Sequence, residues 1–185
     1  MDHFWHTIDG WGTPEDQGQV LAHVLKNTDR SKHINICELG VYCGRTTAIW
    51  NVDLINQNID YNYLAVDHFQ GSAEHKKDRD YLGETTRNLA SIIHKIQIVR
   101  NDSISEAQKH PDNYFDLVYI DASHDYLSVL QDIVAWLPKV KNGGFLAGDD
   151  YDPGHPGVIK AVDYAFTFET IKKIGNQQWL YHRQS

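Results

Sequence analysis

Apolar residues form short continuous runs, and these runs are separated by stretches in which apolar residues recur every three or four positions. A short apolar run bounded by glycine, asparagine or acidic residues is typical of a strand that is buried on both faces. Five such runs predict strands at 34–39, 63–66, 96–99, 115–120 and 143–147. Two further runs, at 171–174 and 179–182, are split by Gly175 and Asn176 and predict a closing hairpin.

The stretches with helical spacing precede and separate these runs. They predict helices at 14–27, 46–57, 84–95, 103–109, 126–137 and 158–168. Thr13 and Pro14 suit a helix start, as N-cap and first helical residue. In the fifth helix one apolar face is predicted, made of Leu127, Leu130, Ile133, Val134 and Leu137.

Strands that alternate with helices predict an α/β fold with right-handed crossovers. We expect a doubly wound, mostly parallel seven-stranded sheet with an antiparallel C-terminal hairpin strand. Residues 1–185 are expected to form a single domain, in which 1–30 are an N-terminal helical lead-in.

Composition and charge narrow the classes of function. The chain has 185 residues, of which 41% are hydrophobic, and a formal net charge of −8. This charge argues against nucleic-acid binding, which needs a cationic surface. No apolar run has the length of a membrane span, and 1–12 lack the apolar core of a signal peptide. We therefore expect a cytoplasmic protein without a membrane partner, in which Cys37 and Cys43 are buried and unpaired.

Acidic residues stand at or beside the carboxyl ends of four predicted parallel strands. They are Glu38, Asp67, Asp121, and the pair Asp149 and Asp150. In open α/β sheets the ligand lies outside the strand carboxyl ends, so these acids are expected to converge on one crevice. The alternative is that each acid only caps the helix that follows it.

A loop with two glycines, Gly40 and Gly44, follows the first strand. Glycines let the backbone turn tightly and approach a ligand closely. Asp67 at the end of the second strand suits a grip on ribose hydroxyls, which fits NAD or S-adenosylmethionine equally well. The third glycine of the dinucleotide fingerprint is missing, and no Lys-Ser/Thr pair follows a glycine, which excludes a P-loop.

Three segments, 38–46, 115–124 and 143–150, resemble in order and spacing the motifs of catechol O-methyltransferase and its relatives. They also resemble macrocin-type sugar O-methyltransferases, which share the Asp-Asp-Tyr at 149–151. The resemblance covers about 34–168 and implies a Rossmann-like, class I S-adenosylmethionine-dependent methyltransferase.

The resemblance implies roles for individual residues. The cofactor would be bound by Glu38, Gly40, Tyr42, Gly44, Thr46, Asp67, His68, Asp102, Ser103 and Asp121. Mg²⁺ would be bound by Asp121, Asp149 and Asp150. Catalysis would fall to His124, which stands where catechol O-methyltransferase has its catalytic lysine, and to Asp121. Macrocin-type enzymes have an acidic residue where this chain has Ser123.

The chemistry supports these roles independently. Methyl transfer from a sulfonium needs a positioned, deprotonated oxygen nucleophile. Carboxylates suit Mg²⁺, which lowers the pKa of a hydroxyl, and a histidine accepts a proton at neutral pH. The alternative for His124 is a histidine at a helix start. A further alternative is an iron site of His124, His155 and Asp149, but the resemblance points to carboxylates and magnesium. His68, His75 and His155 lie in loops near the crevice, as substrate contacts or as loop structure.

We therefore expect a magnesium-dependent O-methyltransferase whose acceptor is a small hydroxylated molecule, a sugar or glycoside first and a phenol second. The alternatives are a hydroxylase of the cephalosporin-hydroxylase-like branch, a non-catalytic S-adenosylmethionine-binding module and an NAD-dependent oxidoreductase. The chain has no long insertion to cover the substrate. The substrate pocket is thus open or completed by a second copy, so a homo-oligomer is left open.

Overall fold

The computed structural model describes residues 1–71, 78–166 and 171–184. Its centre is a seven-stranded sheet in the order β3-β2-β1-β4-β5-β7-β6. The strands are β1 (Ile34–Leu39), β2 (Tyr61–Asp67), β3 (Ile96–Arg100), β4 (Phe115–Ile120), β5 (Val140–Gly148), β6 (Ile171–Ile174) and β7 (Gln178–His182). The first five are parallel, whereas β7 runs antiparallel to both β5 and β6. The predicted fold is confirmed, including the closing hairpin.

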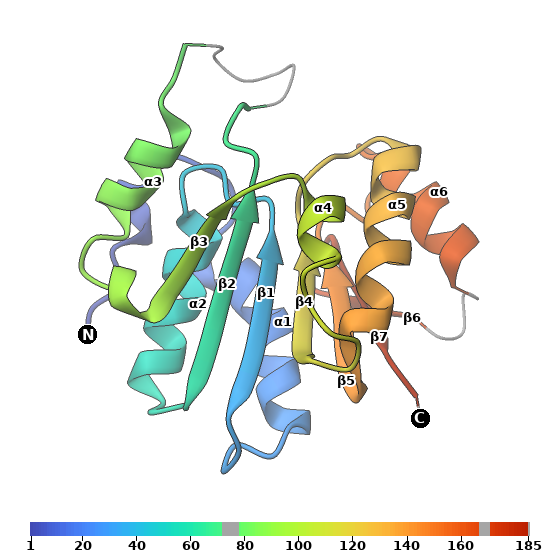
Figure 1. The fold of residues 1–185 in the computed structure, drawn as a ribbon, viewed down its shortest axis with the longest axis horizontal. Coiled ribbons are helices and arrows are strands. Elements are labelled where there is room, and N and C mark those ends of the chain that lie inside the picture. Colours follow the sequence, from blue (N-terminus) through green and yellow to red (C-terminus); the bar gives the residue numbers. More distant parts are fainter. Residues whose placement is uncertain (72–77, 167–170, 185) are drawn as a thin grey trace.

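Helices cover both faces of the sheet (Figure 1). They are α1 (Pro14–Asn27), α2 (Arg45–Asn56), α3 (Tyr81–Asn88), α4 (Ser103–Ala107), α5 (Tyr126–Trp136) and α6 (Pro156–Ala165), with short 3-10 turns at Trp5–Thr7, Ile93–Lys95 and Leu137–Lys139. One core lies between the sheet and α1 and α2, and a second lies between the sheet and α5 and α6. Successive residues of β1 alternate between them, with Ile36 in the first core and Cys37 in the second. This period of two explains why the strands read as continuous apolar runs.

The predicted helix at 84–95 is wrong in its extent. The structure has α3 from Tyr81 to Asn88, and the 3-10 turn Ile93–Lys95 follows separately. Asp80 caps α3 by accepting a hydrogen bond from the Gly83 backbone N–H. Leu89 and Ile92 are buried as their apolar character suggested, but they pack from the irregular segment after the helix. The helical spacing of these apolar residues therefore reflects their burial in the folded protein, and not one continuous helix.

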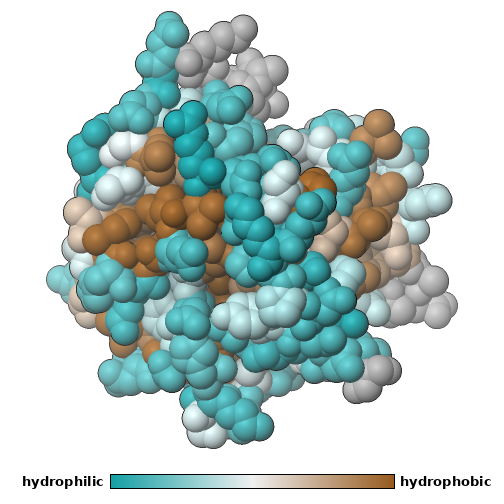
Figure 2. Space-filling view, in the orientation of Figure 1, coloured by the Kyte–Doolittle hydropathy of each residue, from teal (hydrophilic) through white to brown (hydrophobic). Residues whose placement is uncertain are grey.

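The predicted apolar face of α5 is also partly wrong. Leu127 and Val134 are 63% and 66% exposed, and the surface over α5 and α6 is visibly hydrophobic on the right of Figure 2. The buried face instead carries Val129, Ile133 and Trp136, which follow the i, i+4, i+7 spacing of one helical stripe.

The order of the strands places β1 next to β4, and the chain winds outward from this pair in both directions. This is the switch point at which open α/β sheets bind ligands beyond the strand carboxyl ends. Cys37 and Cys43 are buried and unpaired, as predicted. None of the described helices combines the length and the apolar character that a membrane crossing requires.

Candidate functional site

The loop after β1 approaches the loop after β4 at the switch point. Gly40 has a φ of 87°, and a Cβ added to it would lie 1.9 Å from the carbonyl oxygen of Asp121. Any side chain at this position would therefore push the two loops apart. The predicted close backbone approach exists at Gly40, but it is made to another loop of the protein and not to a ligand.

The turn after Gly40 is held by the acid at the end of β2. One Asp67 oxygen, Oδ2, accepts hydrogen bonds from the backbone N–H groups of Val41 (2.8 Å) and Tyr42 (2.9 Å). The other, Oδ1, accepts one from the Phe69 N–H at 2.6 Å. Tyr42 has a φ of 53°, in the left-handed region that non-glycine residues rarely adopt. The carboxylate accepts three backbone hydrogen bonds, and these hold the turn and the strained Tyr42 in place.

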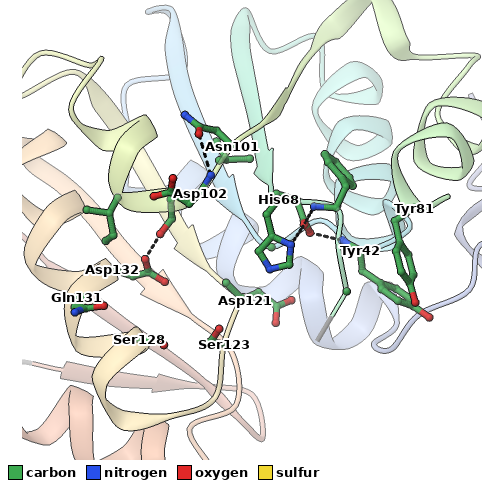
Figure 3. Close-up of a pocket in the computed structure, with 18 residues that line it drawn as sticks. Tyr42, His68, Tyr81, Asn101, Asp102, Asp121, Ser123, Ser128, Gln131 and Asp132 are labelled. Carbon is green, nitrogen blue, oxygen red and sulfur yellow. Dashed lines mark hydrogen bonds and ion pairs between the residues drawn. The ribbon is translucent and has the colours of Figure 1, made fainter. Parts of the chain in front are cut away.

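A cavity of about 270 Å³ opens beyond the ends of β1, β2, β3 and β4, and we call it the first cavity (Figure 3). Seven of the predicted cofactor residues line it: Gly40, Tyr42, Asp67, His68, Asp102, Ser103 and Asp121. In Figure 3, Asp102 and Asp132 lie at one end of the cavity, whereas Tyr42 and Tyr81 lie at the other. Its shape and lining suit an elongated polar ligand with an aromatic part.

The end of the first cavity near β3 is built around α4. The Asp102 carboxylate caps this helix by accepting from the Ser105 N–H at 2.8 Å, and this bond lowers its pKa. Ser103 donates its hydroxyl hydrogen bond to Asp132, which reaches across from α5. Burial raises the pKa of Asp132 to about 6, although the Ser103 bond opposes the shift. Asp102 therefore both caps a helix and borders the cavity.

A cavity of about 370 Å³, which we call the second cavity, adjoins the first. Gly40, Tyr42 and Asp121 line both cavities. The rest of its wall comes from Gly10, Trp11, Gln17, Glu38, Val41, Arg45, Thr46, His124, Asp149, Asp150, His155 and Gln177. A molecule in one cavity would thus meet a molecule in the other beside Asp121.

Glu38 is a buried acid with one oxygen unused. Its Oε2 accepts hydrogen bonds from the hydroxyls of Thr47 (2.6 Å) and Tyr63 (2.7 Å). Its Oε1 is buried and has no partner among the described residues. Burial raises the pKa of Glu38 to about 7, against the effect of the two hydroxyl bonds. A buried acceptor without a partner in a cavity wall is a place for a ligand's donor.

Asp149 is tied to the sheet and to α1. Its Oδ2 accepts from the Gln17 amide at 2.7 Å, and its Oδ1 accepts from the Gln178 amide (3.2 Å) and the Asp150 N–H (2.9 Å). Gln17 itself accepts from the Tyr119 hydroxyl through Oε1 at 2.9 Å. Both Asp149 oxygens are therefore occupied within a network that is buried between α1 and the sheet.

Asp121 differs, because none of the recorded hydrogen bonds among the described residues involves its carboxyl. Burial raises its pKa well above the usual range, and the nearby carboxylates Asp149 and Asp150 raise it further. All three predicted magnesium ligands line the second cavity. Within the described parts of the chain, however, their oxygens do not form a group in which every donor lies within 4.8 Å of the others. Their role as a magnesium site stays a prediction.

Two histidines converge on Asp150 instead. His124 Nε2 lies 2.9 Å from Asp150 Oδ2, and His155 Nδ1 lies 3.4 Å from Asp150 Oδ1. Asp150 has a φ of 62°, so its backbone is strained into the left-handed region. His155 Nδ1 also lies 3.1 Å from Asp152 Oδ2. Of the candidate metal-binding groups among the described residues, this trio is the one whose donor atoms all fall within 4.8 Å.

The predicted site residues thus differ in which cavity they line. Glu38 and Thr46 line only the second cavity, and Gly44 lines neither. Gly44 is the left-handed N-cap of α2, and a Cβ there would lie 3.1 Å from the Leu89 side chain. His75 lies outside the described residues. The role of each in binding or catalysis is still a prediction.

Sequence reasoning missed several residues of the two walls. They are Asn101, Gln131 and Asp132 in the first cavity, and Trp11, Gln17, Arg45 and Gln177 in the second. Trp11 and Gln17 come from α1 and the segment before it, far in sequence from the strand ends, whereas Arg45 is the first residue of α2. A buried polar residue on an apolar helix face, as Gln17 is, was the one available signal.

Known proteins provide an independent comparison. A family model described as a methyltransferase domain matches residues 37–151. Among solved structures, the O-methyltransferase NovP matches with a TM-score of 0.69 and 18% identity, over 91% of this chain and 78% of NovP. An S-adenosylmethionine-dependent O-methyltransferase from Thermotoga maritima matches with a TM-score of 0.67 and 14% identity, over 96% of this chain and 68% of that one.

A third similar structure is CalS11, a TDP-rhamnose 3'-O-methyltransferase of calicheamicin biosynthesis. It matches with a TM-score of 0.61 and 15% identity, over 90% of this chain and 76% of CalS11. No curated protein sequence matches the chain significantly. At these low identities the structural matches establish the fold, whereas the family model spans more than half of the chain.

Proposed function

Because the chain belongs to the methyltransferase domain family, within the class I S-adenosylmethionine-dependent superfamily, we propose that it methylates a hydroxyl oxygen of a small acceptor. The observation that carries this proposal is the meeting of two cavities at Gly40, Tyr42 and Asp121. A transferase for two substrates needs two adjoining sites that share one wall at the reacting atoms. The first cavity would take the cofactor and the second the acceptor.

The residues of the first cavity suit S-adenosylmethionine. Asn101, Asp102 and Ser103 would border the adenosine, and the Gly40–Tyr42 turn would border the amino-acid part. The unpartnered Oε1 of Glu38, on the adjoining wall of the second cavity, would accept from the ammonium group of that part. When bound, the cofactor supplies an electrophilic methyl group on its sulfonium.

The second cavity has features that suit a ring with hydroxyl groups. Trp11 is 70% exposed and its ring lies 5.3 Å from the ring of Tyr42, so the two form an aromatic wall at the cavity. Aromatic side chains pack on the apolar faces of sugar and phenol rings, while carboxylates and imidazoles bind their hydroxyls. The sugar acceptor named for CalS11 supports a sugar or glycoside as the first candidate, and a phenol is the second.

The chain offers two groups for the acceptor proton. His124 is held by Asp150 at 2.9 Å, an arrangement that orients an imidazole and stabilises its protonated form. Asp121 lies at the junction of the two cavities, and its raised pKa makes it a stronger base when ionised. We keep His124 and Asp121 as the predicted catalytic residues.

The proposal includes the predicted divalent cation, and the predicted carboxylates fit it only in part. Asp121 and Asp150 line the acceptor cavity, but both Asp149 oxygens already accept hydrogen bonds from amide groups. We therefore assign no step to a Mg²⁺ ion held by all three carboxylates.

The test is a turnover assay with S-adenosylmethionine and a panel of sugars, glycosides and catechols, in which release of S-adenosylhomocysteine is measured. We expect acceptor-dependent release, with the variant His33→Ala as a matched control because His33 pairs with Asp60 away from both cavities. Binding of S-adenosylhomocysteine without release from any acceptor would indicate a binding module and contradict the proposal.

A further inference from the structure

We propose that His124, Asp150 and His155 form a binding site for one divalent first-row transition-metal ion on the wall of the second cavity. The trio comes from three places that the fold brings together: the loop after β4, the end of β5 and the start of α6. Each residue offers one donor atom, and these three atoms all lie within 4.8 Å of one another. The proposal deepens the proposed function, because it names what would occupy the acceptor side.

The spacing of the donors fits one small cation. Bonds of about 2.0–2.1 Å to a common ion put neighbouring donor atoms about 2.8–3.4 Å apart, for angles between octahedral and tetrahedral. The distances of 2.9 Å from His124 Nε2 to Asp150 Oδ2 and of 3.4 Å from His155 Nδ1 to Asp150 Oδ1 are of this size, although they run to different oxygens of the carboxylate. The two imidazole rings stand edge to face with their centroids 4.6 Å apart, so they do not stack against each other.

The backbone supports this arrangement. Asp150 is in the left-handed region at a φ of 62°, and this strained turn brings its carboxylate between the two histidines. Strain of this kind persists only where the surroundings impose it, and it concentrates at functional sites. Asp152 contacts His155 Nδ1 at 3.1 Å and would border the ion as a further carboxylate.

The donor chemistry selects the metal. Mg²⁺ prefers oxygen ligands, whereas neutral imidazoles suit Zn²⁺, Fe²⁺, Ni²⁺ and Cu²⁺. Three protein donors also leave a position open, as catalytic metal sites do. The side chains of His124 and His155 are 39% and 33% exposed, so the ion would be reachable from the cavity. With the ion bound, His124 would be a metal ligand, and Asp121 would be left as the group for the acceptor proton.

The assignment also explains the acid that is left out. Asp149 is adjacent in sequence, but its oxygens are occupied by Gln17, Gln178 and the Asp150 N–H. It would hold the β5 end in place without touching the ion. The proposed ligand set and the three-carboxylate magnesium set therefore share only Asp150, and variants of His155 and Asp149 test the two sets separately.

The experiment titrates the metal-free full chain with Co²⁺ alone and follows the visible absorption of the bound ion, which reports nitrogen ligands. We expect one Co²⁺ per chain, little competition from excess Mg²⁺, and displacement by Zn²⁺. His124→Ala and His155→Ala should each weaken binding by at least about 100-fold, because losing even an outer-shell partner costs 10–100-fold. His33→Ala is the matched control, since it removes a histidine paired with an aspartate at 3.0 Å elsewhere.

Asp150→Asn and Asp149→Asn complete the set. Asparagine tolerates the left-handed backbone at 150, so a folded variant is expected, and it should bind Co²⁺ weakly. Asp149→Asn should bind Co²⁺ within a few-fold of the wild type. The proposal is overturned if His155→Ala binds Co²⁺ as tightly as the control, or if Asp149→Asn loses the ion while His155→Ala keeps it.

The outcome is separable from that of the proposed function. Co²⁺ binding by the trio without methyl transfer to any acceptor would leave the site standing and count against the transferase. Full transfer in excess chelator would leave the transferase standing. If the titration without chelator also showed no Co²⁺ binding, the proposed site would be removed.

Discussion

The two halves of the cleft use their acids in opposite ways. On the first-cavity side, Asp67 and Asp102 accept hydrogen bonds from backbone N–H groups of the loops that follow β1, β2 and β3. On the second-cavity side, Asp121 lies buried near Asp149 and Asp150, and burial together with their repulsion raises its pKa.

This difference separates acids whose hydrogen bonds shape the site from acids whose negative charge is not yet offset. A carboxylate that accepts several N–H bonds is already satisfied and fixes the loop around it. Carboxylates that crowd together are relieved only by a proton or a cation. The first-cavity side is thus a preformed binding site. The second-cavity side needs a proton or a cation to offset its negative charge.

The largest effect is expected where the two halves touch. Gly40→Ala places a Cβ 1.9 Å from the Asp121 carbonyl oxygen at a φ of 87°, so the loops after β1 and β4 must separate. We expect no measurable binding of S-adenosylhomocysteine and no turnover, with a loss of about 1–3 kcal/mol in the free energy of unfolding. Calorimetric titration and denaturant unfolding measure both. An alanine variant that binds normally would show that the close approach is dispensable.

The second largest effect is expected on turnover and not on cofactor binding. His124→Ala should lower turnover by roughly 10²–10⁴-fold at neutral pH, whether His124 moves the proton or binds the ion. The affinity for S-adenosylhomocysteine should change little, because His124 does not line the first cavity. Steady-state kinetics and a binding titration on the same variant provide the comparison. Near-normal turnover would remove His124 from the acceptor side.

The first-cavity side is tested at Asp67. Asp67→Ala leaves the N–H groups of Val41, Tyr42 and Phe69 without their acceptor. Each unsatisfied donor costs about 1–3 kcal/mol, so we expect affinity for S-adenosylhomocysteine to fall by about 10–100-fold together with stability. Asp67→Asn keeps an acceptor oxygen and should lose less. Equal affinity in wild type and both variants would show that the turn is held by other contacts.

The smallest effect on function is expected at Glu38, where the charge is regulated by burial. Its folded pKa of about 7 lies above the ordinary 4.5, so the stability it contributes is present at low pH and is lost as pH rises through about 7. Glu38→Gln should remove this loss, and the variant should exceed the wild type at pH 8 by on the order of 1 kcal/mol. Its affinity for S-adenosylhomocysteine should fall a few-fold. Parallel pH profiles of the two proteins would contradict the assignment.

Sequence reasoning predicted the fold well because its strands are buried on both faces and its helices alternate with them. The bounds of β1 and β4 match those expected from the apolar runs. It failed at 84–95, because apolar spacing reports burial and not the element that provides it, and it failed on one face of α5, because two apolar residues there are exposed. Leu127 and Val134 show that an apolar residue on a helix need not face the core.

For the site, the positions of the strand-end acids were predictable, but their partners were not. Gln17 meets Asp149 across 132 residues of sequence, and His155 meets Asp150 only because α6 starts beside the β5 end. Asp102 illustrates the limit, since one carboxylate caps a helix and also borders a cavity. Which acids are already satisfied is a property of the folded contacts, and the sequence pattern carries no record of it.

The most direct test of the account is a crystal structure of the protein with S-adenosylhomocysteine. The account predicts the adenosine in the first cavity against Asn101 and Ser103, the amino-acid end at Gly40 where the two cavities meet, within reach of Glu38, and the rest of the second cavity left free beside Asp121. A cofactor bound in the second cavity, or outside both, would contradict the division of the cleft on which the proposed transfer depends.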